Sequence, residues 1–243
     1  FDWMNDSNPA EVKSFLAHGL EWYRRNNSKF THISVAKLEQ DEEFSPRPPV
    51  DASLIRTYSR IKPLPTGADK INESVGRDHM WIYSRELLAI LRSDAQSANG
   101  FPLPASLVRR IARFHLVDNV RGEPDMWRAQ DIKSAVFRAR LSGSTKDKKT
   151  YRFAGTFSQE SADHKRGLGG SMTGEFQIDL AKAKLTKWRA CSDGIAWGRS
   201  QFTPGEPKGR FPFSVAMLEC DDEIAHIVPP QAVSYGENYQ DPD

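Results

Sequence analysis

The chain has 243 residues, of which 38% are hydrophobic, 27% are charged and 10% are aromatic. This length suits one large domain or two small ones, and the apolar and aromatic content excludes a disordered chain. No stretch approaches the roughly 18–20 uninterrupted apolar residues of a membrane span, and 34 basic against 32 acidic residues exclude a histone-like polycation.

A helix is predicted near the start of the chain. Asn8 can cap it, Pro9 suits its first turn, and Glu11 stands where a capping box needs an acidic residue. Apolar residues then recur at helical spacing and form one face: Val12, Phe15, Leu16, Leu20 and Tyr23. A candidate strand at 30–38 follows, and the acidic, proline-rich residues 40–51 are typical of a linker or long loop.

The middle of the chain predicts a strand over 53–61 and then two short helices. The first helix begins at about Ser84 and the second near Pro104, each followed by apolar residues at helical spacing. Residues 99–102 form the turn between them. We therefore expect residues 1–128 to be a helix-rich N-terminal portion.

From residue 133 the hydrophobic period changes from helical to alternating. At least five strands are predicted, at 134–142, 151–157, 172–180, 184–191 and 211–220. Short connections and one-sided alternation favour an antiparallel sheet, closed as a barrel or paired as a sandwich. The predicted fold is α+β: the N-terminal helical portion packs on a C-terminal antiparallel β-barrel or sandwich over 129–228, as one cooperative unit, and 229–243 form a tail.

Two long connections interrupt the β portion. Residues 158–170 are glycine-rich, and residues 194–210 carry aromatic and basic side chains. Loops of this length in a compact β domain are often functional.

The two cysteines, Cys191 and Cys220, both fall in predicted strands. They could form a disulfide if the strands are neighbours, or they could be buried free thiols. No spacing of cysteine or histidine indicates a metal site, and Asp78 with His79 would need ligands from elsewhere in the fold. We expect no cofactor.

Charge is segregated along the chain. Residues 133–210 hold 16 Lys and Arg against 7 Asp and Glu, a difference of +9, whereas residues 211–243 hold 7 acidic residues and no Lys or Arg. A β region with outward arginines is a candidate surface for an anionic partner. The alternatives are that the acidic C-terminal segment covers it, or that these are ordinary solvated charges.

The preferred hypothesis is an exported, non-catalytic binding or accessory domain for an anionic polymer or a carbohydrate, within a larger assembly or beside a protein partner. The predicted binding residues are Arg138, Arg140, Arg152, Arg166, Lys187, Trp188, Arg189, Trp197 and Arg199. The arginines and the lysine supply charge, and the two tryptophans can stack on sugar rings or bases. The near-neutral total charge argues against nucleic acid as the partner.

The alternative hypothesis is a hydrolase with its site around residues 115–123, joined by Asp78 and His79 from an earlier loop. Its candidate catalytic residues are His115, Asp118, Arg121 and Glu123. A histidine beside a carboxylate can act as a general base. No serine or cysteine nearby has a nucleophile signature, and a histidine that ends a helix before an Asp/Asn turn explains the same residues.

Two passages, residues 113–127 and the hairpin 174–198 followed by 211–219, resemble a group of exported bacterial proteins of unassigned function. The similarity covers about residues 75–230. It implies an extracytoplasmic setting and one structural unit over that span, and it brings no catalytic residues with it.

Overall fold

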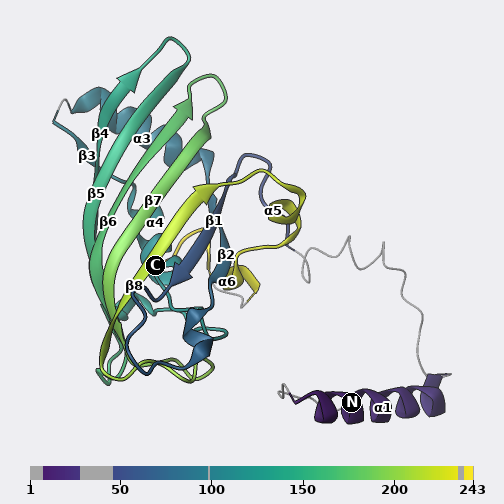
Figure 1. Ribbon diagram of the computed structural model, residues 1–243. Coiled ribbons are helices and arrows are strands. Elements are labelled where there is room, and N and C mark those ends of the chain that lie inside the picture. The colour runs from purple at the N-terminus through teal and green to yellow at the C-terminus, as the bar shows by residue number, and fades with distance from the viewer. Residues whose placement is uncertain (1–7, 28–45, 98, 235–237, 243) are drawn as a thin grey trace. The chain divides into compact units, whose positions relative to one another are not determined.

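In the computed structural model the chain forms two compact units, Phe1–Asp41 and Glu42–Asp243. The structure describes residues 8–27, 46–97, 99–234 and 238–242 (Figure 1). The first unit contains helix α1 (Pro9–Asn26), and the Asn8 side chain accepts a hydrogen bond of 3.0 Å from the Ala10 amide, so the predicted helix is confirmed. The candidate strand at 30–38 lies outside the described residues, as do residues 40–45 of the predicted loop 40–51.

The second unit is built on one eight-stranded sheet with the order β2-β1-β8-β7-β6-β5-β4-β3. Its strands are β1 (Ser53–Arg60), β2 (Gly76–Ile82), β3 (Phe101–Pro102), β4 (Ile132–Ser144), β5 (Lys148–Glu160), β6 (Gly167–Asp179), β7 (Lys184–Trp197) and β8 (Arg210–Glu219). Every neighbouring pair is antiparallel. The α+β class is confirmed, but the predicted barrel or sandwich is wrong, because a single sheet stays open between its edge strands β2 and β3.

Strands from both halves of the chain build this sheet, so the predicted boundary at 128/129 does not separate two layers. Strand β8 pairs with β7 on one side and with β1 on the other. The first half therefore contributes β1, β2 and β3 as well as helices. The five strands predicted after residue 133 are confirmed as β4 to β8, and the strand at 53–61 is confirmed as β1.

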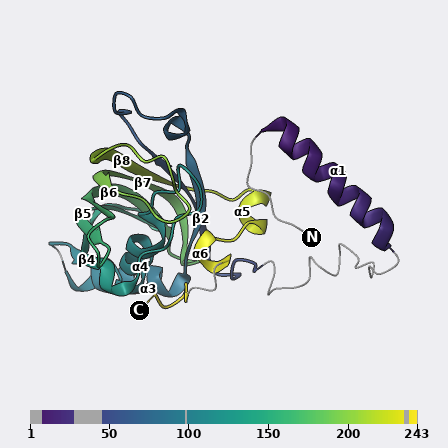
Figure 2. The same ribbon diagram turned by 90° about the horizontal axis from the view of Figure 1, so that it is seen from below.

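Helices cover one face of the sheet. The two predicted helices appear as α3 (Ser84–Gln96) and α4 (Ala105–Arg110), and α4 continues into a π-helical turn, Ile111–His115. Figure 2 shows the sheet curving around α4, with α3 beside it on the same side. Short 3-10 turns lie at Lys70–Glu73 and Ala129–Asp131, and two short helices, α5 (Glu223–Ile227) and α6 (Gln231–Ser234), follow β8.

The core lies between this inner face and the helices. Tyr151, Phe176 and Trp188 are cross-strand neighbours on β5, β6 and β7, and all three are fully buried. The Phe176 and Trp188 rings stack with their centroids 5.4 Å apart, and those of Tyr151 and Phe176 are 5.1 Å apart. The prediction that Trp188 is an exposed binding aromatic is therefore wrong, and the residue belongs to the core.

The strands are longer than the hydrophobic pattern indicates. Residues 167–170 pair in the sheet ladder as the start of β6, so the predicted loop 158–170 shrinks to residues 161–166. Glycine suits this stretch because a Cβ at Gly170 would lie 2.2 Å from the Asp193 carbonyl oxygen. Strand β7 likewise runs on to Trp197, which leaves residues 198–209 as the second connection.

The described residues of the predicted tail are folded. Tyr239 is buried, stacks on Phe114 with ring centroids 5.5 Å apart and meets the Trp81 ring edge-on at 5.8 Å. The buried Arg110 donates from Nε to the Tyr239 carbonyl oxygen at 2.8 Å. This packing forms a second, smaller core beside β2, in which Leu54 also takes part.

Both cysteines are free thiols, on or just after neighbouring strands. Cys191 pairs in register with Ala216 and so does not face Cys220. Cys191 is exposed, which differs from the buried thiol considered above, and burial raises the pKa of Cys220 to about 11. Among the described helices, none is both long and apolar enough to cross a membrane.

Candidate functional site

The outer face of the sheet, the face opposite α3 and α4, carries five of the predicted binding residues. On β4 and β5 the inward positions are occupied by buried aromatic and small residues, and the alternating positions point outward. The outward cations on β4, β5 and β7 include Arg138, Arg140, Arg152, Lys187 and Arg189. We call this group the basic face.

Cross-strand pairing sets several of these cations in one row. Arg140 pairs with Arg152, Arg152 with Glu175, and Glu175 with Arg189, so three arginines and one carboxylate cross four strands. Lys187 and Arg152 both donate to Glu175, and these hydrogen bonds lower the pKa of its carboxyl group. The carboxylate therefore offsets part of the charge of the row and leaves a cationic surplus.

A hollow of about 280 Å³ lies where β4 and β5 meet the turn before β3. Arg138, Arg140 and Arg152 line it together with Asn99 and Gly100, and no acidic side chain is among its described lining residues. Arg138 donates from Nη2 to the Gly100 carbonyl oxygen at 2.9 Å, which fixes one guanidinium at the rim. The hollow is the most cationic concave surface formed by the predicted binding residues.

The two connections singled out by the sequence meet at one end of the sheet. Residues 161–166, residues 198–206 and residues 123–131 enclose a cavity of about 1050 Å³. A neighbouring hollow of about 370 Å³ shares Lys165, Gly198 and Glu206 with it and continues along residues 206–210. We call the two hollows together the sheet-end groove.

Two stacked arginine–tryptophan pairs flank this groove. The Arg166 guanidinium lies 3.9 Å from the centroid of the Trp127 ring and donates from Nη2 to the Asp125 carbonyl oxygen at 2.7 Å. Burial lowers the pKa of Arg166 to about 10, so the side chain is still cationic at neutral pH. The Arg210 guanidinium lies 4.2 Å from the centroid of the half-buried Trp197 ring.

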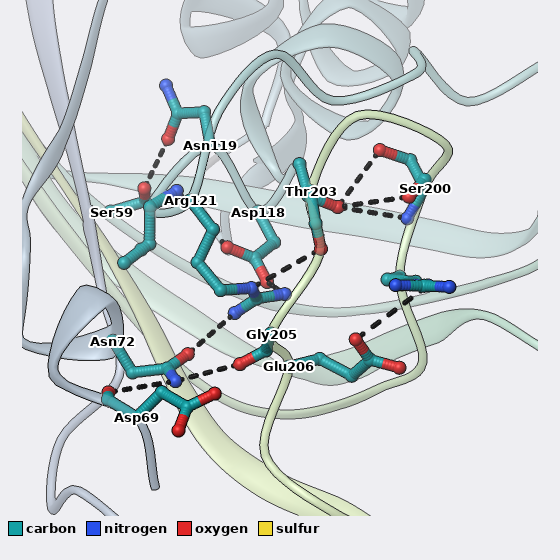
Figure 3. A network of polar contacts seen from close by, with 12 residues as sticks. Ser59, Asp69, Asn72, Asp118, Asn119, Arg121, Ser200, Thr203, Gly205 and Glu206 are labelled. Atoms are coloured by element: carbon teal, nitrogen blue, oxygen red, sulfur yellow. Dashed lines mark hydrogen bonds and ion pairs between the residues drawn. The ribbon is translucent and has the colours of Figure 1, made fainter. Parts of the chain in front are cut away.

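A buried polar network holds the 198–206 connection in place (Figure 3). The fully buried guanidinium of Arg121 pairs with Asp118 at 2.6 Å and donates from Nη1 to Asn72 Oδ1 at 3.1 Å. Its Nε donates to the Thr203 carbonyl oxygen at 3.4 Å. Asn72, which is also fully buried, donates from Nδ2 to the Gly205 carbonyl oxygen at 2.9 Å. Three segments distant in sequence are thereby locked together.

Close backbone approaches complete the wall of the groove. Gly122 has a φ of +142°, and a Cβ there would lie 2.4 Å from the carbonyl oxygen of Phe202, which forms a bridge with Glu123. Gly198 has a φ of +71°, and its Cβ would lie 1.8 Å from the Lys165 carbonyl oxygen. Only glycine fits these contacts, because any side chain would collide with the facing backbone.

His115 belongs to a different, buried cluster. Its Nε2 is joined to the Tyr239 hydroxyl at 2.6 Å, and that hydroxyl accepts a hydrogen bond of 3.2 Å from the Trp81 amide. Its Nδ1 faces Asp78 Oδ2 at 3.3 Å, within ion-pair range but outside hydrogen-bond geometry. Asp78 Oδ1 accepts from the amides of His79 and Gln231, both at 2.8 Å.

The four candidate catalytic residues do not converge. His115 faces Asp78 and Tyr239, the Asp118–Arg121 pair faces Asn72 and Thr203, and Glu123 is exposed at its bridge with Phe202. The two earlier residues lie on strand β2, so the prediction that they stand in a loop is wrong, and Asp78 does reach His115. His79 instead accepts from Arg56 Nε at 3.3 Å, and its burial lowers its pKa. Asp78, His79 and Glu123 also line one pocket of about 570 Å³.

The predicted binding residues divide between the two surfaces. Arg166, Trp197 and Arg199 lie at the sheet-end groove, where Arg199 Nε is 3.8 Å from Glu206, and they are not part of the basic face. Within the described part of the chain, no three His, Cys, Asp or Glu side chains are grouped so that they could hold a metal ion.

Sequence reasoning missed Asn72, Thr203 and Phe202. The first two are polar residues in irregular segments, where nothing in the local pattern indicates burial. Phe202 stands in a connection that was identified, and an aromatic residue within a long polar connection is the signal that could have been followed. In the structure Phe202 is 56% exposed. No protein-family model, curated protein or solved structure matches the chain, so the resemblance to exported bacterial proteins stays a prediction.

Proposed function

We propose that the protein is a non-catalytic binding domain that holds an acidic polysaccharide on the basic face of its sheet. The observation that carries this proposal is the hollow lined by Arg138, Arg140 and Arg152. The row of cross-strand pairs runs on from Arg152 through Glu175 to Arg189. An extracytoplasmic setting is part of the same proposal and rests on the sequence resemblance.

Guanidinium groups suit this partner. An arginine presents several N–H donors in a planar fork that matches a carboxylate or sulfate group with two parallel hydrogen bonds. Neighbouring strands are about 4.8 Å apart, so Arg140 and Arg152 stand about 4.8 Å apart in the row, and Arg189, beyond Glu175, stands about 10 Å from Arg152. A polymer with repeated acidic groups can engage several arginines at once, which a single small anion cannot.

The acidic C-terminal segment does not neutralise this face. Its described residues after β8 pack beside β1 and β2, where Asp222 pairs with Arg56 at 2.7 Å. Glu219, at the end of β8, reaches β7, where it accepts from the Trp188 amide at 2.8 Å. Strand β5 lies four strand positions from β1, which corresponds to about 19 Å. That separation exceeds the screening length of about 10 Å at 0.1 M salt. Asp222 therefore neutralises the charge of Arg56, whereas the arginines on β4 and β5 are too far from Asp222 for their charges to be neutralised in the same way.

The test compares binding to polygalacturonate, heparin, dextran and single-stranded DNA at about 25 and 150 mM NaCl. We expect the two acidic polysaccharides to bind with an affinity that falls as salt rises, and dextran not to bind to this face. The triple variant Arg140→Gln, Arg152→Gln, Arg189→Gln should weaken binding by about tenfold or more. The control variant Lys62→Gln, Lys70→Gln, Arg92→Gln removes the same charge from exposed positions elsewhere and should bind as the parent does.

A second variant tests the carboxylate in the row. Glu175→Gln removes the acid that Lys187 and Arg152 share, so it should raise affinity for both acidic polysaccharides about threefold or more. Equal losses in the two triple variants, or tighter binding of DNA than of either polysaccharide, would reject the proposal. An unchanged affinity in Glu175→Gln would show that the row is not where the polymer binds.

A further inference from the structure

We propose that the sheet-end groove is a second binding site, which takes an uncharged oligosaccharide. This inference goes beyond the acidic-polymer proposal, because it concerns other residues at the end of the sheet and a ligand without charge. Its test does not depend on whether the basic face binds an acidic polymer.

The charge balance of the groove favours a neutral ligand. The main cavity is lined by five acidic and four basic side chains, among which Glu206 lies 3.8 Å from Arg199 and Asp163 lies 3.5 Å from Lys165. A polyanion or polycation would meet like charges along such a surface. Sugar hydroxyl groups both donate and accept hydrogen bonds, so they match a lining of carboxylates, guanidinium groups and amines together.

The groove is built before any ligand arrives. A buried guanidinium, that of Arg121, and a buried amide, that of Asn72, are used to hold the backbone at Thr203 and Gly205. On the other side, the Gln201 amide donates to Asp125 Oδ2 at 3.2 Å. The hydrogen bonds of these buried groups fix the backbone of the connection, and a fixed wall lowers the conformational entropy lost when a ligand binds.

One side chain in this wall is suited to contact a sugar ring. Phe202 leaves 56% of its surface accessible although its backbone is fixed by the bridge to Glu123. An exposed aromatic ring on a rigid segment offers a flat apolar face to the C–H side of a sugar. The continuation of the cavity past Lys165 and Glu206 into the second hollow gives the groove room for a chain of sugars.

The experiment titrates the full chain with three neutral hexasaccharides, cellohexaose, maltohexaose and hexa-N-acetylchitohexaose, by isothermal titration calorimetry. We expect at least one to bind, with an affinity that differs little between low and moderate salt. Phe202→Ala and Glu206→Gln should each weaken that binding about fivefold or more. Val136→Ala is the matched control, since Val136 is also 56% exposed but lies on the outer face of β4.

The outcomes separate this inference from the acidic-polymer proposal. The triple arginine variant of the basic face should bind the hexasaccharide as the parent does, and Phe202→Ala should bind polygalacturonate as the parent does. No binding of any hexasaccharide at about 5 mM, a concentration that registers a millimolar Kd, overturns the inference. So does binding that both groove variants leave unchanged, or binding of a charge-balanced unstructured peptide in place of the sugars.

Discussion

Replacing Arg121 with methionine tests whether the sheet-end groove depends on the buried polar network. The Arg121 side chain is fully buried. Its removal takes away the cation that pairs with Asp118 and the donors that bind Asn72 Oδ1 and the Thr203 carbonyl oxygen. Breaking a buried ion pair by deleting one partner costs about 3–5 kcal/mol. Because the Asp118 side chain is 16% exposed, water can solvate part of the unpaired carboxylate. We therefore expect the free energy of unfolding to fall by about 3 kcal/mol.

Urea unfolding followed by tryptophan fluorescence measures this loss, since Trp188 lies in the core of the sheet. A loss of that size corresponds to a decrease in Tm of about 6–12 °C for a unit of roughly 200 residues. Adding Asp118→Asn to the Arg121→Met variant removes the unpaired negative charge and should restore about 1–2 kcal/mol of the free energy of unfolding. Binding of the hexasaccharide should weaken in the single variant, while binding to the basic face persists.

Arg199→Met provides the control, because Arg199 lines the same groove but is 54% exposed and lies 3.8 Å from its partner Glu206. Exposed ion pairs at such distances contribute little, so its stability should change by less than about 0.5 kcal/mol. If Arg121→Met loses no more stability than Arg199→Met, the reasoning is refuted, and the network would be a consequence of the fold rather than a support for it.

Three further predictions concern stability and thiol chemistry. Tyr239→Phe removes the hydroxyl bonded to His115 and should cost about 2 kcal/mol in urea unfolding without altering either binding activity, since it leaves buried groups unpaired. His79 has a lowered pKa, so below its ordinary value of about 6.5 the unfolded chain takes up a proton that the folded state does not. The contribution of neutral His79 to the free energy of unfolding should therefore be complete above pH 6.5 and decrease as the pH falls towards the pKa of His79 in the folded state. The His79→Gln variant should show a smaller decrease over this pH range. At pH 8 a thiol reagent should modify the exposed Cys191 faster than Cys220, whose pKa is about 11, and equal rates would contradict the placement of both.

The sequence predicts the outer arginines because alternation is a local property. Arg138 and Arg140 are two residues apart on one strand, so they share a face whatever the strand pairs with. The same rule, applied to β7, would have placed Trp188 correctly. It stands between Lys187 and Arg189, both of which point outward, and a residue between two outward side chains faces inward.

Strand β2 and the groove could not be predicted in this way. Every residue of β2 except Arg77 is buried, because the segment that includes Tyr239 covers its outer face, so the sequence shows no alternation there. The partners of Arg121 come from residue 72 on one side and residue 203 on the other. Contacts between such distant segments are fixed by the pairing of β1 with β8, which no local pattern reveals.

The position of His115 explains why a catalytic motif and a structural one can read alike in sequence. A general base needs a ring nitrogen that a substrate can reach. Here Nε2 is taken by the Tyr239 hydroxyl, Nδ1 faces Asp78, and the imidazole side chain is fully buried. The cluster instead ties residues 238–242 and the first amide of α6 to β2, which closes the smaller core over Trp81. The buried imidazole therefore anchors the chain at this edge of the sheet and supports the fold.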